Sequence, residues 1–467
     1  MQQKPNILFI LIDDMGWRDL SCSGSEFYET PVIDELRSEG MFFTDAYSAC
    51  PVCSPTRASI LTGRYPADLG LTDWIDMEGT YHPCRGRLID APYIKHMPAG
   101  EKTIAQELKE QGYSAWHVGK WHLGGREYYP EQFGFDVNIG GCDWGHPHEG
   151  YFSPYHIETL PDGPEGEFLT DRLTDEAIGL LEKQDADHPF YLNLCYYDVH
   201  IPIQAKPDDI VYFEKKAGRL GLDRKKTFEM GEPFPTDQKR NQKITRRLLQ
   251  SDPVYAALIY NLDRNIGRLL GALERLGRKE NTLIFFTSDN GGLATSEGSP
   301  TCNFPASEGK GWMYEGGMRV PFLTVWDGRI RPGSVCNTPM TSIDFYPTML
   351  EAAGGNKERV SAREGFSLVP LLEETGELPE RPIFWHYPHY GNQGGTPGAS
   401  VRLGEYKLIE FFEDGHTELY NLVQDVEEKE DLTGKLPEKS RELLKLLHEW
   451  QERVNAQMPA VNPDYKG

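Results

Sequence analysis

Four short and largely apolar runs recur along the chain, and each is followed directly by polar residues. The runs lie at residues 7–12, 113–118, 190–196 and 283–286. Apolar runs of this kind are typical of strands that are buried on both faces of a parallel sheet. Other segments repeat their apolar positions every three or four residues, as amphipathic helices do. The clearest of these lie at residues 103–111, 169–183 and 254–276. The two patterns together predict an α/β fold, with a large, mostly parallel sheet flanked by helices.

The pattern changes near residues 376–382, where the composition becomes acidic and contains prolines. Beyond this point the sequence predicts a small antiparallel sheet and one covering helix. The expected strands are residues 383–387, 400–403, 406–412 and 418–421, and the helix is residues 438–454. We therefore expect a catalytic domain over residues 1–375 and a C-terminal α+β subdomain over residues 376–467 that contributes to the substrate pocket.

Chemically active side chains follow the four apolar runs. In chain order they are Asp13 and Asp14, Lys120 and His122, His200, and Asp289 and Asn290. Open α/β sheets place their sites at the carboxyl ends of strands, so we expect these groups to lie close together. Neighbouring carboxylates repel one another unless a cation lies between them, although a turn cap is a common role for a single aspartate. Oxygen ligands without Cys or His favour Ca²⁺ or Mg²⁺ over zinc.

A second feature is the stretch from Cys50 to Arg64, which reads as a loop that enters a short helix. Prolines 51 and 55 prevent regular structure early on, and Gly63 ends the helix. Cys53 is thus expected just ahead of a helix N-terminus, where an anion is favoured, with Arg57 about one turn further on. A redox Cys-x-x-Cys pair or a buried structural cysteine are the alternatives. Neither alternative accounts for the Pro-x-Arg sequence and the helix that follows.

The run from Cys53 to Arg64 resembles the signature of type I sulfatases, and residues 119–124 resemble the second signature of that family. The resemblance implies an alkaline phosphatase-like fold. It also implies that a formylglycine-generating enzyme oxidises Cys53, and that the hydrate of the resulting aldehyde is the nucleophile. The family usually holds calcium, which implies Ca²⁺, with Mg²⁺ as the other possibility. The implied ligands are Asp13, Asp14, Asp289, Asn290 and the modified Cys53.

The resemblance also implies roles for the remaining site residues. Arg57, Lys120 and Lys310 would neutralise the sulfate, and His200 or Lys310 would protonate the leaving oxygen. His122 would take a proton from the modified residue 53 in the final step. Three irregular segments rich in polar and aromatic residues, 71–100, 128–164 and 386–395, are expected to form the substrate wall. Within the last of these, His386 and His389 are predicted to contact a sugar, although a solvent-facing hairpin tip is the alternative.

Composition narrows the choice of partner and compartment. Lysine and arginine number 48 and aspartate and glutamate 72, which gives a net charge of −24. Such a field repels nucleic acid and anionic membranes, so any anion site must be locally basic. Eight cysteines without a framework spacing predict free thiols and a reducing compartment. No signal peptide or membrane-spanning segment is recognisable, and we expect a cytoplasmic protein, with export as the alternative if the N-terminus has been trimmed.

Three functions remain open at this point. The first is a sulfatase that acts on a sulfated sugar, of the galactose or N-acetylgalactosamine type, or on small aryl sulfates. The second is a phosphonate monoester or phosphodiester hydrolase with the same nucleophile. The third is a protein with an unmodified Cys53 that binds sulfated glycans without hydrolysing them. A complete set of catalytic residues favours an enzyme, and Lys120, His122 and Lys310 favour sulfate.

Overall fold

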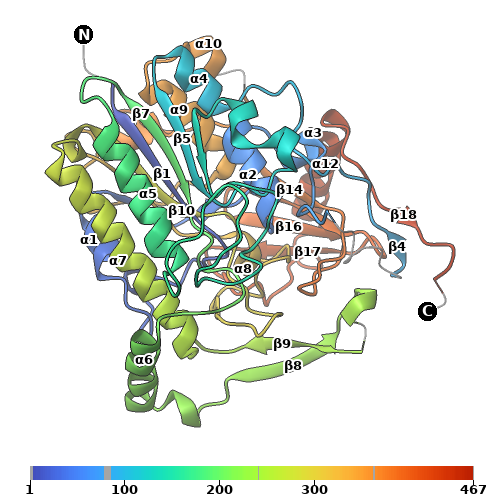
Figure 1. The fold of residues 1–467 in the computed structure, drawn as a ribbon. Coiled ribbons are helices and arrows are strands. Elements are labelled where there is room, and N and C mark those ends of the chain that lie inside the picture. The colour runs from blue at the N-terminus through green and yellow to red at the C-terminus, as the bar shows by residue number, and fades with distance from the viewer. Residues whose placement is uncertain (1–3, 78–85, 240, 361–362, 466–467) are drawn as a thin grey trace.

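The computed structural model describes residues 4–77, 86–239, 241–360 and 363–465. Its core is an eight-stranded sheet with the strand order β12-β2-β11-β10-β1-β7-β5-β6 (Figure 1). The strands are β1 (Asn6–Ile12), β2 (Met41–Phe43), β5 (Ser114–Gly119), β6 (Val137–Ile139), β7 (Phe190–Cys195), β10 (Thr282–Ser288), β11 (Phe322–Trp326) and β12 (Ser334–Cys336). Strand β1 lies between β10 and β7 and is parallel to both, while β11 is antiparallel to β10 and β2. The predicted mixed, mostly parallel sheet is confirmed.

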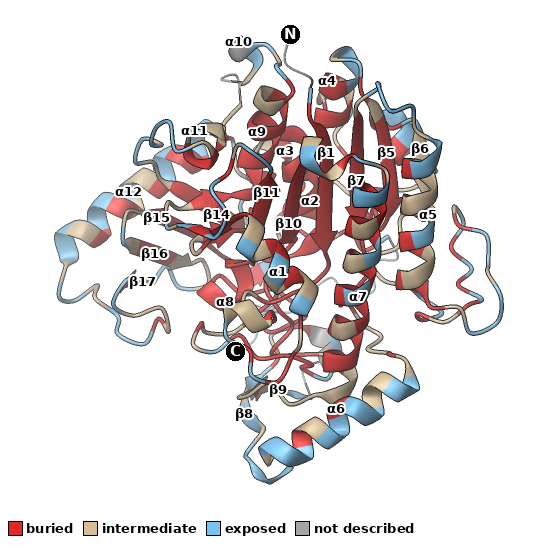
Figure 2. Ribbon diagram, turned by 90° about the vertical axis from the view of Figure 1, so that its left-hand side faces the viewer, coloured by how far each residue is buried: buried red, intermediate tan, exposed pale blue. Residues whose placement is uncertain are grey.

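Helices cover both faces of this sheet because the side chains of β1 alternate between two separate cores (Figures 1 and 2). Leu8, Ile10 and Ile12 pack with α1 (Pro31–Glu39), α5 (Leu169–Lys183) and α7 (Pro253–Arg275). Ile7, Phe9 and Leu11 pack with α2 (Cys53–Thr62), α4 (Ile104–Glu110) and α9 (Phe345–Ala352). All seven residues of β1 are buried, which explains why its sequence is apolar without alternation.

The C-terminal part forms the predicted four-stranded antiparallel sheet. It consists of β14 (Ile383–Tyr387), β15 (Gly398–Leu403), β16 (Tyr406–Phe411) and β17 (Thr417–Asn421), in that order. Helix α12 (Pro437–Arg453) covers one face, where Trp450 stacks on Phe384 with ring centroids 4.6 Å apart. The structure thus contains both the sheet and the helix expected here, whereas the domain boundary near residue 376 stays a prediction.

A buried ion cluster joins this small sheet to the larger part of the chain. Lys407 on β16 lies 3.1 Å from a Glu315 oxygen and 2.8 Å from a Glu428 oxygen, and all three side chains are buried. Glu315 begins α8 (Glu315–Met318) and also pairs with Arg319 at 2.8 Å. Removal of one partner from such a cluster leaves an uncompensated buried charge, so the two parts are held in a fixed relation.

The remaining elements are short or lie at the periphery. They are β3 (Ala46–Tyr47), α3 (Pro66–Leu69), β4 (Leu88–Ile89), α6 (Pro207–Leu220), β8 (Phe228–Pro233), β9 (Lys243–Arg247), β13 (Met340–Thr341), α10 (Lys357–Val360), α11 (Val369–Leu372) and β18 (Ala460–Val461). Strands β8 and β9 form a hairpin that extends away from the body of the molecule (Figure 1). Among the described helices, none combines the length and apolar composition needed to cross a bilayer.

Candidate active site

The polar residues that follow the strands converge at one edge of the sheet. Because Ile12 on β1 is in register with Ser288 on β10, the pairs Asp13–Asp14 and Asp289–Asn290 emerge side by side. Hydrogen bonds from the Asp289 amide to the Ile12 carbonyl (3.1 Å) and from the Asp13 amide to the Asp198 carbonyl (2.7 Å) tie the strand ends together. This edge is the location expected for a site in an open α/β sheet.

Three cations pair with three carboxylates at this edge. The ammonium of Lys120 lies 2.6 Å from an Asp13 oxygen, that of Lys310 lies 2.8 Å from an Asp14 oxygen, and the guanidinium of Arg57 lies 2.8 Å from an Asp289 oxygen. All six side chains are buried. Buried charges are tolerated only when they are paired and hydrogen-bonded, so the six groups depend on one another. Their formal charges sum to zero.

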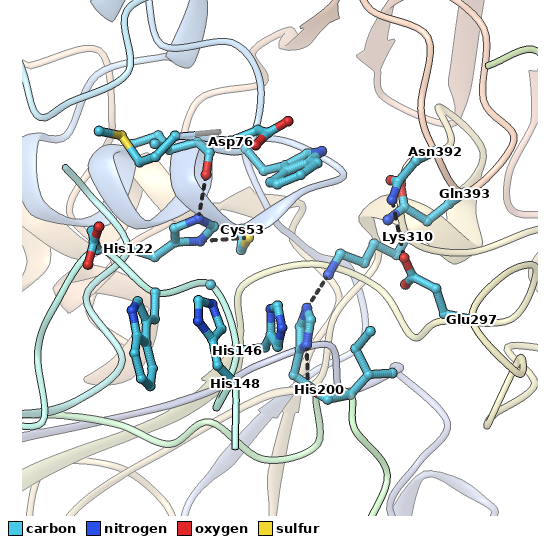
Figure 3. A pocket seen from close by; sticks show the side chains of 17 residues that line it. Cys53, Asp76, His122, His146, His148, His200, Glu297, Lys310, Asn392 and Gln393 are labelled. Carbon is cyan, nitrogen blue, oxygen red and sulfur yellow. Dashed lines mark hydrogen bonds between the residues drawn. The ribbon is translucent and has the colours of Figure 1, made fainter. Parts of the chain in front are cut away.

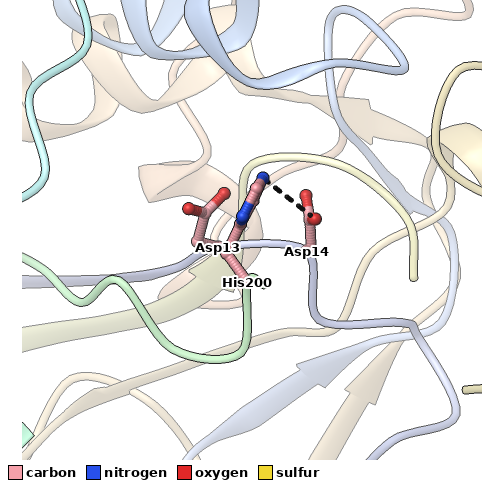
Figure 4. A group of neighbouring side chains, drawn as sticks. All are labelled: Asp13, Asp14 and His200. Carbon is pink, nitrogen blue, oxygen red and sulfur yellow. Dashed lines mark ion pairs between the residues drawn. The ribbon is translucent and has the colours of Figure 1, made fainter. Parts of the chain in front are cut away.

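Two of these carboxylates, those of Asp13 and Asp14, form a group with His200 that could hold a metal ion (Figure 4). Ligand atoms of Asp13, Asp14 and His200 all lie within 4.8 Å of one another. Two further buried oxygens, Asp13 Oδ1 and Asn290 Oδ1, accept no hydrogen bond from any described residue. The Asn290 amide nitrogen donates to Asp14 Oδ1 at 2.8 Å, so its oxygen is the atom left to bind a cation. This oxygen-rich set fits a hard divalent cation.

Cys53 is the first residue of α2 and is buried beside His122. Its sulfur lies 3.3 Å from His122 Nδ1, and His122 Nε2 lies 3.0 Å from the Ile75 carbonyl oxygen. A carbonyl oxygen can only accept, so Nε2 carries the proton, which leaves Nδ1 unprotonated in the neutral ring. Burial lowers the pKa of His122 and raises the pKa of the Cys53 thiol. A protonated thiol is a poor nucleophile, so Cys53 in its unmodified form is not activated for attack.

His200 and Lys310 form a second contact pair. Lys310 Nζ lies 2.9 Å from His200 Nε2, and His200 Nδ1 lies 3.1 Å from the Ile201 carbonyl oxygen. By the same reasoning Nδ1 is protonated and Nε2 accepts from the lysine. Burial opposes the charge on Lys310, but Asp14 and the other nearby anionic groups together outweigh it and raise the pKa of the lysine. Burial, together with the charge of Lys310, lowers the pKa of His200.

A cavity of about 680 Å³ opens above these groups (Figure 3). Cys53, His122, His200 and Lys310 line it, and each of the three segments expected to form the substrate wall supplies residues to it. These residues are Trp74, Ile75, Asp76 and Met77, then Asp143, Trp144, Gly145, His146 and His148, and finally Asn392 and Gln393. Residues 78–85 of the first segment lie outside the described part of the chain. The volume is within the range of about 300–1,000 Å³ that is usual for small-molecule sites.

The structure corrects the prediction for two histidines of the last segment. His386 on β14 donates from Nε2 to the Gln457 carbonyl at 2.8 Å and accepts from the Gln451 amide at 3.3 Å. His389 is completely buried, with Nε2 2.8 Å from the Thr72 hydroxyl. Neither ring lines the cavity, because His386 packs β14 against α12 and the residues after it, and His389 contacts Thr72 of the larger part of the chain.

Sequence reasoning missed Glu297, and it predicted that residues 128–164 line the cavity without predicting how their rings are arranged. Glu297 belongs to a turn after β10 and accepts a hydrogen bond from the Asn392 amide at 3.1 Å. Trp144, His148, His146 and His200 form a row of rings, with successive centroids 4.1, 4.6 and 5.8 Å apart. The histidines and the tryptophan within residues 142–148 are the sequence feature that could have predicted this row. No sequence feature marks Glu297 as a residue of the cavity.

The family models and the known proteins that match this chain all point to the same family. A sequence model of the family described as "Sulfatase" matches residues 5–355, and one described as "N-sulphoglucosamine sulphohydrolase, C-terminal" matches residues 308–457. The chain is 32% identical to N-acetylgalactosamine-6-sulfatase of Canis lupus familiaris over 429 residues, which cover 87% of this chain and 71% of that protein. It is 30% identical to arylsulfatase A of Homo sapiens, over 98% of this chain and 89% of that protein.

A solved structure supports the same relationship. The chain resembles Ps i-CgsB in complex with k-i-k-neocarrahexaose with a TM-score of 0.75 and 28% sequence identity. The match covers 96% of this chain and 93% of that one.

The carboxylate cluster predicts a dependence of stability on divalent cations. We expect Ca²⁺ added to metal-depleted protein to raise the thermal unfolding midpoint, because a ligand of the folded state at a hundredfold excess over its Kd stabilises by about 2.7 kcal/mol. Asp14→Asn should remove this increase. Asp327→Asn, which makes the same charge change at an exposed position, should retain it. Equal increases in all three proteins would contradict the assignment, and parallel titrations with Mg²⁺ would rank the two ions.

Proposed function

The chain belongs to the sulfatase family and is a sulfuric ester hydrolase, and we propose that its substrate is a sulfated sugar of the galactose or N-acetylgalactosamine type. In this proposal a formylglycine made from Cys53 is the nucleophile and a divalent cation, Ca²⁺ rather than Mg²⁺, lies beside it. The observation that carries the mechanism is the position of Cys53 in a cavity that it shares with His122, His200 and Lys310. The choice of sugar rests on the similarity to N-acetylgalactosamine-6-sulfatase.

The charge balance of the site supports this proposal. Three buried carboxylates already neutralise Arg57, Lys120 and Lys310. A divalent cation held by Asp13, Asp14, Asp289 and Asn290 would add two positive charges and supply Lewis-acid stabilisation of the reacting oxygens. A sulfate monoester brings one negative charge and a deprotonated nucleophile brings a second. The loaded site is then neutral again, which a buried site of this kind requires.

The modification of Cys53 would supply the nucleophile that the protonated thiol does not provide. A formylglycine-generating enzyme would convert it to an aldehyde, whose hydrate offers a hydroxyl nucleophile. His122 Nδ1, which is unprotonated and 3.3 Å from the side-chain atom of residue 53, is placed to accept a proton from this position. The start of α2 adds the positive end of a helix dipole, which favours negative charge on the same group.

Departure of the sugar oxygen requires a proton, and Lys310 is placed to supply it. Lys310 is charged, lines the cavity and donates to His200 Nε2, which carries no proton of its own in the observed arrangement. In this proposal the proton therefore originates on Lys310 and reaches the leaving oxygen through His200 Nε2. A positioned acid of this kind contributes a factor of about 10²–10⁴ to the rate.

The proposed activity is tested by sulfate release from a panel of monosulfated sugars, together with 4-nitrophenyl sulfate and an aryl phosphonate. We expect hydrolysis of N-acetylgalactosamine 6-sulfate or galactose 6-sulfate to be the most efficient and that of the phosphonate to be the least. Cys53→Ala should reduce turnover by at least about four orders of magnitude, since removal of a nucleophile abolishes the covalent route. The matched control Cys336→Ala changes a half-buried cysteine outside the cavity. Near-normal turnover in Cys53→Ala, or preference for the phosphonate, would contradict the proposal.

The leaving-group proton can be tested separately with His200→Ala. We expect kcat on the sugar sulfate to fall by about 10²–10⁴. On 4-nitrophenyl sulfate the loss should be much smaller, because nitrophenolate leaves without protonation. His188→Ala, at an exposed position, is the control and should change neither rate. An equal loss on both substrates would show that His200 acts in sulfate binding rather than in proton transfer.

A further inference from the structure

The cavity carries opposite charges at its floor and on its walls. Lys310 lies at the floor, next to Cys53 and His200, and it is the only lysine or arginine among the described residues that line the cavity (Figure 3). Three carboxylates, those of Asp76, Asp143 and Glu297, line it as well. An anionic group that enters therefore finds a cation at the floor alone, and finds carboxylates elsewhere.

We infer that the cavity selects a neutral sugar carrying a single sulfate, and that it excludes a second sulfate or a carboxylate close to the ester that is cleaved. This inference rests on the proposed function, and it adds the charge class of the substrate. One anion, the scissile sulfate, would match the net positive charge left at the floor by a bound divalent cation and a deprotonated nucleophile, and Lys310 would contact it there. A second anion would have to lie against the carboxylates of the wall without a compensating lysine or arginine in the described lining.

Asp143 makes the strongest contribution to this exclusion. Its side chain is half-buried and lines the cavity. Within the described part of the chain, its carboxylate takes part in no hydrogen bond or ion pair, so no neighbour offsets its charge. A charge that is partly shielded from water acts over several ångströms with a reduced effective dielectric, and it repels an anion in the same cavity.

Glu297 adds a second carboxylate on the side of Asn392 and Gln393 (Figure 3). It is held by the Asn392 amide at 3.1 Å, and Lys239, which does not line the cavity, lies 3.7 Å behind it. Lys239 offsets part of this charge, so we expect Glu297 to discriminate less than Asp143. Carboxylate and amide groups together suit sugar hydroxyls, because they accept and donate hydrogen bonds without requiring a charged partner.

The row of rings formed by Trp144, His148, His146 and His200 gives the cavity an aromatic side that suits a neutral sugar. Trp144 stacks on His148, and His146 lies parallel to His200. Burial, with the neighbouring His148 as a second cause, lowers the pKa of His146 to about 4. His146 is therefore uncharged at neutral pH and offers a ring face, not a positive charge, to the substrate.

The inference is tested by comparing N-acetylgalactosamine 6-sulfate with N-acetylgalactosamine 4,6-disulfate and following release of the 6-sulfate by product mass. The wild-type enzyme, checked for the modified residue 53, should show a kcat/KM at least about tenfold lower on the disulfate. Asp143→Asn should reduce the ratio of the two kcat/KM values, monosulfate over disulfate, about threefold to tenfold, and Glu297→Gln should reduce this ratio less. Added salt to 0.5 M should also narrow the ratio, since screening weakens charge repulsion. Glu449→Gln, which makes the same change at an exposed position on α12, should leave the ratio unchanged.

The outcomes separate the inference from the proposed function. A ratio of kcat/KM values is independent of the fraction of folded enzyme, so a destabilised variant still gives a valid result. Equal or faster hydrolysis of the disulfate by the wild-type enzyme would overturn the inference and leave the proposed function standing. If Asp143→Asn leaves the ratio of kcat/KM values unchanged, the wall carboxylates are not the cause of the preference for the monosulfate, and the inference is overturned. Hydrolysis of neither ester would overturn the proposed function, and the inference with it.

Discussion

The mutual neutralisation of six buried charges is the constraint on which the site depends. Asp13, Asp14 and Asp289 can be buried only because Lys120, Lys310 and Arg57 meet them at 2.6–2.8 Å. None of these groups is near another in the sequence except for the adjacent pair of aspartates. The order of the central strands, with β1 between β10 and β7, is what brings them together. The fold thus supplies an electrically balanced edge of the sheet, onto which one divalent cation, one sulfate ester and a deprotonated nucleophile can be added without net charge.

Charge is arranged in layers outward from this edge. The six groups at the sheet edge, Lys310 included, are neutral as a set, and carboxylates line the cavity wall above them. The chain as a whole carries a net charge of −24. Long-range attraction of a polyanion is therefore weak, and binding relies on contacts formed inside the cavity. A small substrate with one anionic group suits this arrangement better than a densely charged chain.

Most of the fold and the residues at the floor of the cavity could be predicted from the sequence, because apolar runs and the polar residues after them mark the buried strands and their ends. Strands such as β1 are buried on both faces and leave a continuous apolar run, and the polar residues that follow them mark the functional edge. Cys53 was recognisable because prolines, an arginine and a helix surround it at fixed spacing. Sequence patterns do not reveal which face of a short antiparallel strand is covered. For this reason His386 was assigned to the substrate, although it packs against α12. Glu297 is an isolated acidic residue in a turn, and only the tertiary structure brings it to the cavity.

Catalysis by this site depends most directly on the chemical state of residue 53. The decisive measurement is a peptide mass spectrum across Cys53, made on protein from a host that contains a formylglycine-generating enzyme. We expect that the sulfur has been lost and that an aldehyde, or its hydrate, stands in its place. An unmodified thiol in such a host would contradict the proposed nucleophile. The fold and the carboxylate cluster would remain, and the evidence would then favour a protein that binds sulfated glycans without cleaving them.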